Sequence, residues 1–171
     1  MAFVTVAVLQ RDRVTAGMLD DFAAGAARDG DDDGIRRILD EVAASTGMGF
    51  VALARVTDTR WIACQVVDQI DFGMSPGEEL RVSTTICNDI REHGNVVVID
   101  DVAGNPKWLS HPAPSLYGFK SYVSLPIILA DGSFYGTLCA IDPLPRKLAR
   151  PDVVSALKDF ADQLGAMLSK G

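Results

Sequence analysis

The sequence predicts an α+β domain in which helices cover both faces of a central antiparallel sheet. Near both ends of the chain, apolar residues recur at intervals of three and four, as they do on one face of a helix. In the middle they gather in short runs rich in Val and Ile, separated by turn residues, as in sequential antiparallel strands. We therefore expect five to six strands, with the terminal helices on one face and short helices and loops on the other.

Composition and charge describe a soluble globular protein. Of the 171 residues, 48% are apolar and 23% are charged, which is ordinary for such proteins. The net charge is −7, and there is no stripe of Lys and Arg to neutralise phosphate groups. We therefore expect neither a nucleic acid nor an anionic membrane as a partner.

The first residues and the cysteines indicate a cytoplasmic protein. The apolar run MAFVTVAVL, at 1–9, is too short to span a bilayer, and unlike a signal peptide it has no basic leader before it. The three cysteines, Cys64, Cys87 and Cys139, are far apart and form no CxxC pair. That spacing predicts reduced thiols, with neither a disulfide framework nor a zinc site.

Two helices are predicted before the sheet. The first should end at 28–34, RDGDDDG, where Gly and Asp interrupt it; its apolar positions are spaced by four and are Val14, Met18, Phe22 and Ala26. The second keeps one apolar face over 35–43 and stops at the glycines of TGMG. We take residues 1–33 as a helical extension with an acidic linker, and 34–171 as the domain proper.

The acidic linker also resembles half of a calcium-binding loop. Asp29, Asp31 and Asp33 fall at alternating ligand positions, and Asp40 falls at the twelfth position. A loop of the EF-hand type needs a bidentate Glu at that position and an apolar eighth residue, where this chain has Arg36. We therefore expect a solvated linker and no metal site.

The middle of the chain alternates strands with short helices. FVALARVTD, at 50–58, and RWIACQVVDQI, at 60–70, are rich in strand-forming residues and predict an antiparallel pair. Ser83 or Thr84 can cap a helix that ends at Gly94. VVVID then predicts a buried strand, and the Pro of NPKW favours a single helical turn.

The clearest pattern is the hairpin SYVSLPIILADGSFYGTLCAID, at 121–142. Asp131 and Gly132 suit a two-residue type I′ turn, in which both central residues have positive φ. Pro126 cannot donate to a neighbouring strand, which predicts an edge strand or a bulge. A last helix should begin at Pro151 with a coiled-coil-like apolar seam formed by Val153, Leu157, Phe160, Leu164 and Met167.

Three segments resemble the GAF domain family. GFKSYVSLPIILADGSFYGTLCAID resembles the final strand pair of these domains. STTICNDIREHGNVVVIDDVAGNPKW resembles their helix, short strand and acidic connector, and PSLYGFKSYVSLPI resembles the entry into the fifth strand. The resemblance extends over 35–167. It is nearest in kind to the sensor domains of bacterial histidine kinases, and more distant from those of phytochromes and cyanobacteriochromes.

The resemblance implies a sensory or regulatory domain that binds a small molecule. It also implies a homodimer formed through the terminal helices, and a role as the input domain of a histidine kinase or similar protein. In relatives that attach a bilin, a Cys followed by His precedes the segment matching SLYGFKS. Here Leu109 falls near that Cys, and His111 lies near the His. We therefore expect no covalent bilin; a ligand would be non-covalent, and its class is unspecified.

The ligand is expected between one sheet face and a connector of residues 100–119. Along the strand from Ser121, odd positions such as Val123 and Leu125 are apolar and should pack on the terminal helices. Even positions are mixed, and the hydroxyl groups of Tyr122 and Ser124 should face the ligand together with aromatic and His side chains of the connector. The candidate ligand-binding residues are Asp100, Trp108, His111, Tyr117, Phe119, Tyr122, Ser124 and Cys139.

Two alternatives accompany this interpretation. A ligand-free module for dimerisation or protein interaction would fill the pocket with its own aromatics, such as Trp108 and Tyr122. A thiol enzyme that reduces free methionine sulfoxide, as a minority of GAF domains do, would need an accessible thiolate and a second thiol nearby. Cys87 lies among Ile86 and Ile90 without an obvious activating base. We therefore expect inert thiols and no catalytic residues, and no kinase motif is present in the sequence.

Overall fold

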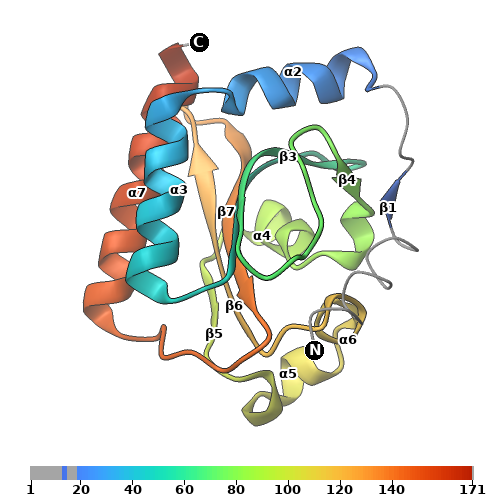
Figure 1. The fold of residues 1–171 in the computed structure, drawn as a ribbon, viewed down its shortest axis with the longest axis vertical. Coiled ribbons are helices and arrows are strands. Elements are labelled where there is room, and N and C mark those ends of the chain that lie inside the picture. Colours follow the sequence, from blue (N-terminus) through green and yellow to red (C-terminus); the bar gives the residue numbers. More distant parts are fainter. Residues whose placement is uncertain (1–12, 15–18, 171) are drawn as a thin grey trace.

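The computed structural model describes residues 13–14 and 19–170 and contains one antiparallel sheet of seven strands (Figure 1). The strands lie in the order β1-β4-β3-β2-β7-β6-β5. Their bounds are Arg13–Val14 for β1, Phe50–Val56 for β2, Trp61–Asp68 for β3, Glu79–Leu80 for β4, Val97–Ile99 for β5, Ser121–Ile128 for β6 and Phe134–Asp142 for β7. The predicted α+β architecture is confirmed, and the two strands beyond the core five, β1 and β4, have two residues each.

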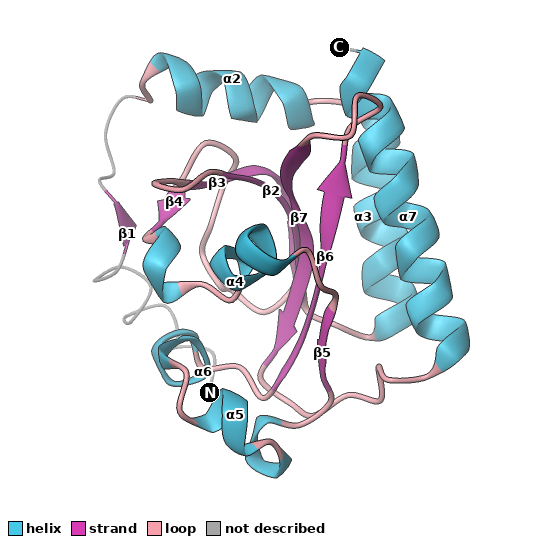
Figure 2. Ribbon diagram, turned by 180° about the vertical axis from the view of Figure 1, so that it is seen from behind, coloured by secondary structure: helices cyan, strands magenta, loops and turns pink. Residues whose placement is uncertain are grey.

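Helices cover the two faces of the sheet as predicted (Figures 1 and 2). The long helices α3 and α7 lie together on one face, and the short helices lie on the other. The α-helices are α2 at Asp21–Gly30, α3 at Asp33–Thr46, α4 at Cys87–His93, α5 at Pro106–Leu109, α6 at Pro112–Tyr117 and α7 at Pro151–Lys170. Two short 3₁₀ helices are η1 at Val82–Thr84 and η2 at Val102–Gly104.

The period-two pattern of β6 separates two hydrophobic cores, as the sequence predicts. Val123, Leu125 and Ile127 pack with α3 and α7 in one core. Tyr122 belongs to the other core, where the short helices lie, and Ser124 on the same face is fully buried. Because side chains alternate across a strand, one sheet supports both cores. The seam of α7 also lies in the first core, so it packs within the chain.

The first predicted helix is wrong in its starting point. Asp20 caps α2 by accepting the Ala23 N–H at 2.8 Å, so the helix begins at Asp21. Val14 instead lies in β1, where it pairs with Glu79 of β4. Residues 15–18 lie outside the described residues. A side-chain cap marks a helix start more directly than apolar spacing does, because it satisfies a backbone donor that the helix leaves unpaired.

The acidic residues around the end of α2 have structural partners. Asp32 caps α3 through the Ile35 N–H, and Asp29 accepts the hydroxyl of Tyr135 at 2.6 Å. Arg36 pairs with the carboxylates that flank this cap. Among the described residues no group of side chains is arranged to hold a metal ion, and no described helix is long and apolar enough to cross a membrane.

The turn between β6 and β7 differs from the predicted type I′ turn. Gly132 has a φ of 87°, but Asp131 does not have a positive φ. Gly132 N–H donates to the Leu129 carbonyl, and Leu129 N–H donates to the Ser133 carbonyl, both at 2.9 Å. This is a three-residue hairpin loop whose last residue is a left-handed Gly. The Asp131 carboxylate also accepts two bonds from Ser133, which favours the longer loop.

Two other local predictions are refined. The helix expected from Ser83 or Thr84 is split, because the extended backbone at Thr85 separates η1 from α4. Its predicted end is confirmed, since Gly94 closes α4 in the left-handed conformation. Pro126 is tolerated because β5 pairs only with the 122–124 part of β6, so β6 has no second neighbour at the proline.

Candidate ligand-binding cavity

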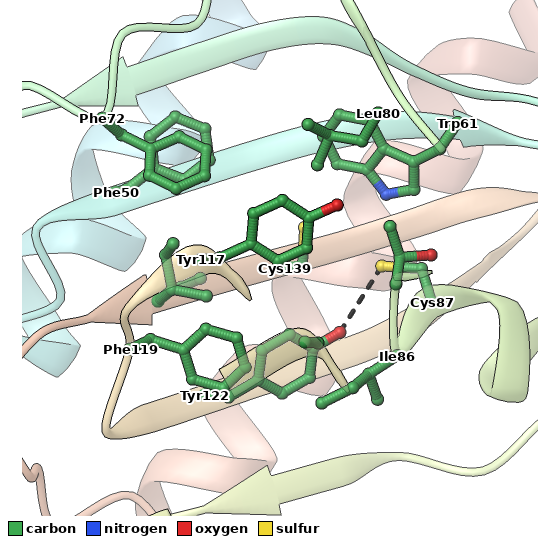
Figure 3. Close-up of a pocket in the computed structure, with 14 residues that line it drawn as sticks. Phe50, Trp61, Phe72, Leu80, Ile86, Cys87, Tyr117, Phe119, Tyr122 and Cys139 are labelled. Atoms are coloured by element: carbon green, nitrogen blue, oxygen red, sulfur yellow. Dashed lines mark hydrogen bonds between the residues drawn. The ribbon is translucent and has the colours of Figure 1, made fainter. Parts of the chain in front are cut away.

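A small cavity of about 40 Å³ lies between the sheet and the short helices (Figure 3). It occupies the face of the sheet that the sequence predicts for a ligand. Its walls are almost wholly apolar, and six of its lining residues are aromatic: Phe50, Trp61, Phe72, Tyr117, Phe119 and Tyr122.

The aromatic wall comes from strands on one side and from loops on the other. The Phe72 ring packs at a tilt against Phe50, with ring centroids 4.5 Å apart, and its centroid lies 6.2 Å from that of Tyr117. The carboxylate of Asp68 holds the Phe72 loop by accepting the Phe72 N–H at 2.9 Å and the N–H of the next residue at 2.8 Å. Left-handed Gly118 ends α6, and the two aromatic residues that flank it both line the cavity.

One end of the cavity is polar and is centred on the sulfur of Cys87. Thr137 Oγ1 donates to Cys87 Sγ at 3.1 Å, the Tyr122 hydroxyl lies 3.4 Å from it, and Ser124 Oγ lies 3.8 Å from it. The Trp61 indole Nε1 is buried without a hydrogen-bond partner. Figure 3 shows its nitrogen directed toward the side of the cavity where Cys87 lies.

These neighbours change the acidity of the buried groups. Burial by itself raises the pKa of Cys87, but the polar hydrogens of Cys139, Thr137, Tyr122 and Trp61, which would donate to a Cys87 thiolate, outweigh it and lower the pKa to about 6. The pKa of Cys139 moves in the opposite direction, well above its usual range, because of its hydrogen bond to Cys87 and its burial. Burial, with the neighbouring cysteines, also raises the pKa of Tyr122. Cys87 is therefore the group that ionises first.

We expect a thiolate titration in the folded protein with a pKa of about 6. Because this pKa lies below the ordinary 9.0, the thiolate stabilises the fold fully above pH 9, and the effect is lost as the pH falls through 6. The ultraviolet absorbance of thiolates against pH measures the titration. Cys87→Ser should remove the step, and Cys64→Ser should keep it. A wild-type chain with no step below pH 8 would contradict the assignment.

Four of the eight predicted site residues line the cavity, namely Tyr117, Phe119, Tyr122 and Cys139. Ser124 lies just behind the wall, where it contacts the Cys87 sulfur. Tyr122 and Ser124 were chosen from the alternation of β6, which places their side chains on one face. Tyr117 and Phe119 were chosen as aromatic residues of the connector, and alternation left the face of Cys139 open.

The structure does not bring the other three predicted residues to the cavity. The Asp100 carboxylate accepts the N–H groups of Leu148 and Ala149 and so holds the segment before α7. The Trp108 ring packs in the core, 5.6 Å from the His111 ring, and lines an outer groove. These positions were inferred from a loop, where sequence alternation carries no directional information.

His111 joins two of the short helices. Its Nδ1 accepts the N–H of Ala113 at 3.0 Å and caps α6, while its Nε2 lies 3.4 Å from the Asp89 carboxylate on α4. Burial lowers the pKa of His111, and the opposing effect of Asp89 is smaller. His111 thus positions the connector. Leu109, which falls near the attaching Cys of bilin-binding relatives, is exposed. The three cysteines of the chain lie elsewhere, on β3, α4 and β7.

Sequence reasoning missed four principal cavity residues. Phe50 begins β2 and Trp61 begins β3, and the second residue after each of them, Ala52 and Ala63, lies in the same core as the cavity. The alternation of these two strands would therefore have indicated both aromatic residues. Cys87 was considered only as a catalytic thiol. Phe72 lies in an irregular loop, and no sequence signal points to it.

The comparisons with known proteins agree with this fold. Residues 32–168 match the GAF domain family. The chain belongs to the GAF domain family. The comparison with curated proteins found no match.

Solved structures with the same fold have low sequence identity to the chain. The GAF domain of an Acinetobacter phosphoenolpyruvate-protein phosphotransferase has a TM-score of 0.65 and 10% identity, with 89% of this chain and 96% of that chain covered. The type II free methionine-R-sulfoxide reductase of Thermoplasma acidophilum has a TM-score of 0.62 and 13% identity, covering 88% and 96%. The GAF-B domain of DevS from Mycobacterium smegmatis has a TM-score of 0.58 and 14% identity, covering 79% and 90%.

Proposed function

We propose that the chain is a sensory or regulatory GAF domain that binds a small, largely apolar molecule in the aromatic cavity. The observation that carries the proposal is the lining itself: six aromatic side chains surround a space whose one polar end holds an unpaired indole N–H. Ligand sites are typically apolar with a few convergent polar groups. The ligand would then combine a flat apolar body with one hydrogen-bond acceptor directed toward Trp61.

The size of the cavity implies that the connector must move when the ligand binds. A volume of about 40 Å³ holds only one or two water molecules, whereas ordinary ligand pockets measure several hundred Å³. Tyr117 and Phe119 form the wall that can move, because Tyr117 is the last residue of α6 and Phe119 lies in the short link between α6 and β6. Outward movement of these rings would enlarge the space.

Movement of the connector would reach the terminal helices through β6. β6 begins at Ser121, two residues after Phe119, and the strand face opposite the cavity packs against α3 and α7. A ligand changes the helix arrangement only if it binds one arrangement more tightly than the other. We propose that these helices pass the change to the output domain of a histidine kinase or a similar protein, and that they pair with those of a second copy.

The test compares the native mass with the denatured mass of protein isolated from its own cells. Extra mass that is lost on denaturation is the expected result. A second readout uses Trp108→Phe, which leaves Trp61 as the single tryptophan, and follows its fluorescence while the bound molecule is removed and restored. Trp61→Phe is the control and should show no response. A chain that carries no extra mass would overturn ligand binding.

The narrowness of the cavity favours a second candidate, the ligand-free interaction module. Tyr117, Phe119 and Tyr122 already fill most of the space beside the sheet, as such a module requires. Its signature in the same experiment is a dimer that carries no extra mass. An empty monomer would oppose both candidates.

A further inference from the structure

We infer that Cys87 and Cys139 form a redox-active thiol pair, which hydrogen peroxide or a hydroperoxide of similar size oxidises to a disulfide within the chain. The pair lies at the polar end of the cavity on α4 and β7. Its reaction does not depend on the ligand-binding function proposed above.

The groups around the Cys87 sulfur are arranged for an anion. Thr137 donates to it, and the hydroxyls of Tyr122 and Ser124 are also within contact distance. A neutral thiol is only a weak acceptor, so hydroxyl groups that converge on one sulfur are better satisfied by a thiolate. The thiolate is the nucleophile in thiol chemistry.

A buried donor without a partner faces the same sulfur. Trp61 is 2% exposed, and its Nε1–H has no hydrogen-bond partner. An unpaired buried N–H is unfavourable, and a negative charge on Cys87 would give it an electrostatic partner. Figure 3 shows the indole nitrogen on the Cys87 side of the ring. Trp61 and Thr137 therefore act as positioning residues for the thiolate.

A second thiol is available to complete the reaction. Cys139 lines the same cavity as Cys87, and its partner across the β6–β7 pair, Ser124, lies 3.8 Å from the Cys87 sulfur. Cys64 differs from Cys87 in place and in acidity. It lies in the other core, against Gly30 at the end of α2, and burial raises its pKa to about 12. The chain thus contains its own matched control thiol.

The cavity selects the oxidant by size. A space of about 40 Å³ admits a molecule little larger than water, such as hydrogen peroxide. A whole amino acid such as free methionine sulfoxide does not fit unless the Tyr117 and Phe119 wall opens, although Cys87 and Cys139 together provide the thiols that its reduction would need. Size therefore favours the hydroperoxide.

The reaction has two balanced steps. The Cys87 thiolate attacks one peroxide oxygen, the O–O bond breaks, and a sulfenic acid forms while hydroxide leaves and takes up a proton to become water. The Cys139 sulfur then attacks the Cys87 sulfur, the S–O bond breaks and an S–S bond forms. The departing hydroxyl takes the Cys139 proton and becomes a second water. Two thiols are oxidised, and one peroxide is reduced to two waters.

The test treats the full folded chain with hydrogen peroxide and maps its thiols by mass. We expect the wild type to lose two thiols with a disulfide between Cys87 and Cys139, and a thiol reductant to restore both. Cys64→Ser should behave in the same way. In Cys139→Ser the reaction should stop at a Cys87 sulfenic acid, which a sulfenate-specific reagent traps. In Cys87→Ser the remaining thiols should be oxidised more than about tenfold more slowly than Cys87 is in the wild type.

The pH profile separates positioning from a merely structural role. The wild-type oxidation rate should rise through a pKa of about 6, whereas Thr137→Val and Trp61→Phe should move this midpoint upward, because each removes a donor to the thiolate. Circular dichroism identifies any variant that fails to fold. The mass mapping of the wild-type thiols tests the inference without relying on any variant. A folded wild type in which Cys87 reacts no faster than Cys64, or forms no disulfide with Cys139, would overturn the inference.

Discussion

Gly136→Ala is expected to lower the free energy of unfolding by about 4 kcal/mol or more, which is at the upper end for single substitutions. Gly136 lies in β7 between two neighbouring strands, opposite Arg55 of β2 and Ile127 of β6. A Cβ atom at this position would overlap the carbonyl oxygen of Ala54. Because the obstacle is backbone in a central strand, it cannot move without breaking the sheet. Urea unfolding followed by circular dichroism measures the loss.

Gly104→Ala is the matched control for this substitution. Gly104 lies in η2, and a Cβ atom there would meet no other atom within 4 Å. Its free energy of unfolding should stay within about 0.5 kcal/mol of the wild type. A Gly136→Ala chain that folds and unfolds at the wild-type urea midpoint would show that β2 and β7 are not packed as described.

Phe72→Ala should cost about 3–5 kcal/mol, because a buried aromatic ring is lost and a cavity remains. Phe72 is 2% exposed and packs against Phe50 and Tyr117. The enlarged space would be apolar and adjoin the existing cavity. An apolar cavity of this kind binds benzene, so benzene should raise the melting temperature of the variant more than that of the wild type. Thermal unfolding with and without benzene measures both effects.

Leu109→Ala controls for the general effect of shortening an apolar side chain. Leu109 is 57% exposed, so the free energy of unfolding of this variant should differ from that of the wild type by less than about 0.5 kcal/mol. Benzene should change the melting temperatures of this variant and of the wild type equally. If Phe72→Ala has the melting temperature of the wild type, or if benzene does not raise its melting temperature, then Phe72 is not part of the cavity wall.

The two functional proposals make separable demands on the cavity. Ligand binding requires the Tyr117 and Phe119 wall to open, whereas peroxide oxidation requires only the present volume beside Cys87. Cys139→Ser removes the second thiol and leaves the aromatic wall in place. It should therefore lose disulfide formation, whereas the mass comparison on the wild type tests ligand binding.

Local patterns in the sequence were sufficient for the fold and for one wall of the site. Gly47 and Gly94 end helices in the left-handed conformation, as their positions after apolar stripes predict. The alternation along β6 places Tyr122 and Ser124 on the cavity side and Val123 on the helix side. These features depend on neighbours a few residues away, so the residue types alone carry the information.

Tertiary structure alone decided the rest. No sequence spacing reveals that Phe72, held by Asp68, completes the aromatic wall, or that Asp100 turns away to hold the segment before α7. Likewise, Cys87 becomes an acidic thiol only where α4 brings it to β6 and β7. The sequence by itself determined most of the longer helices and strands, the two faces of the sheet and the family, but not the short elements β1, β4 and α6. The cavity and its chemistry arose from contacts between distant segments, whose geometry no local pattern encodes.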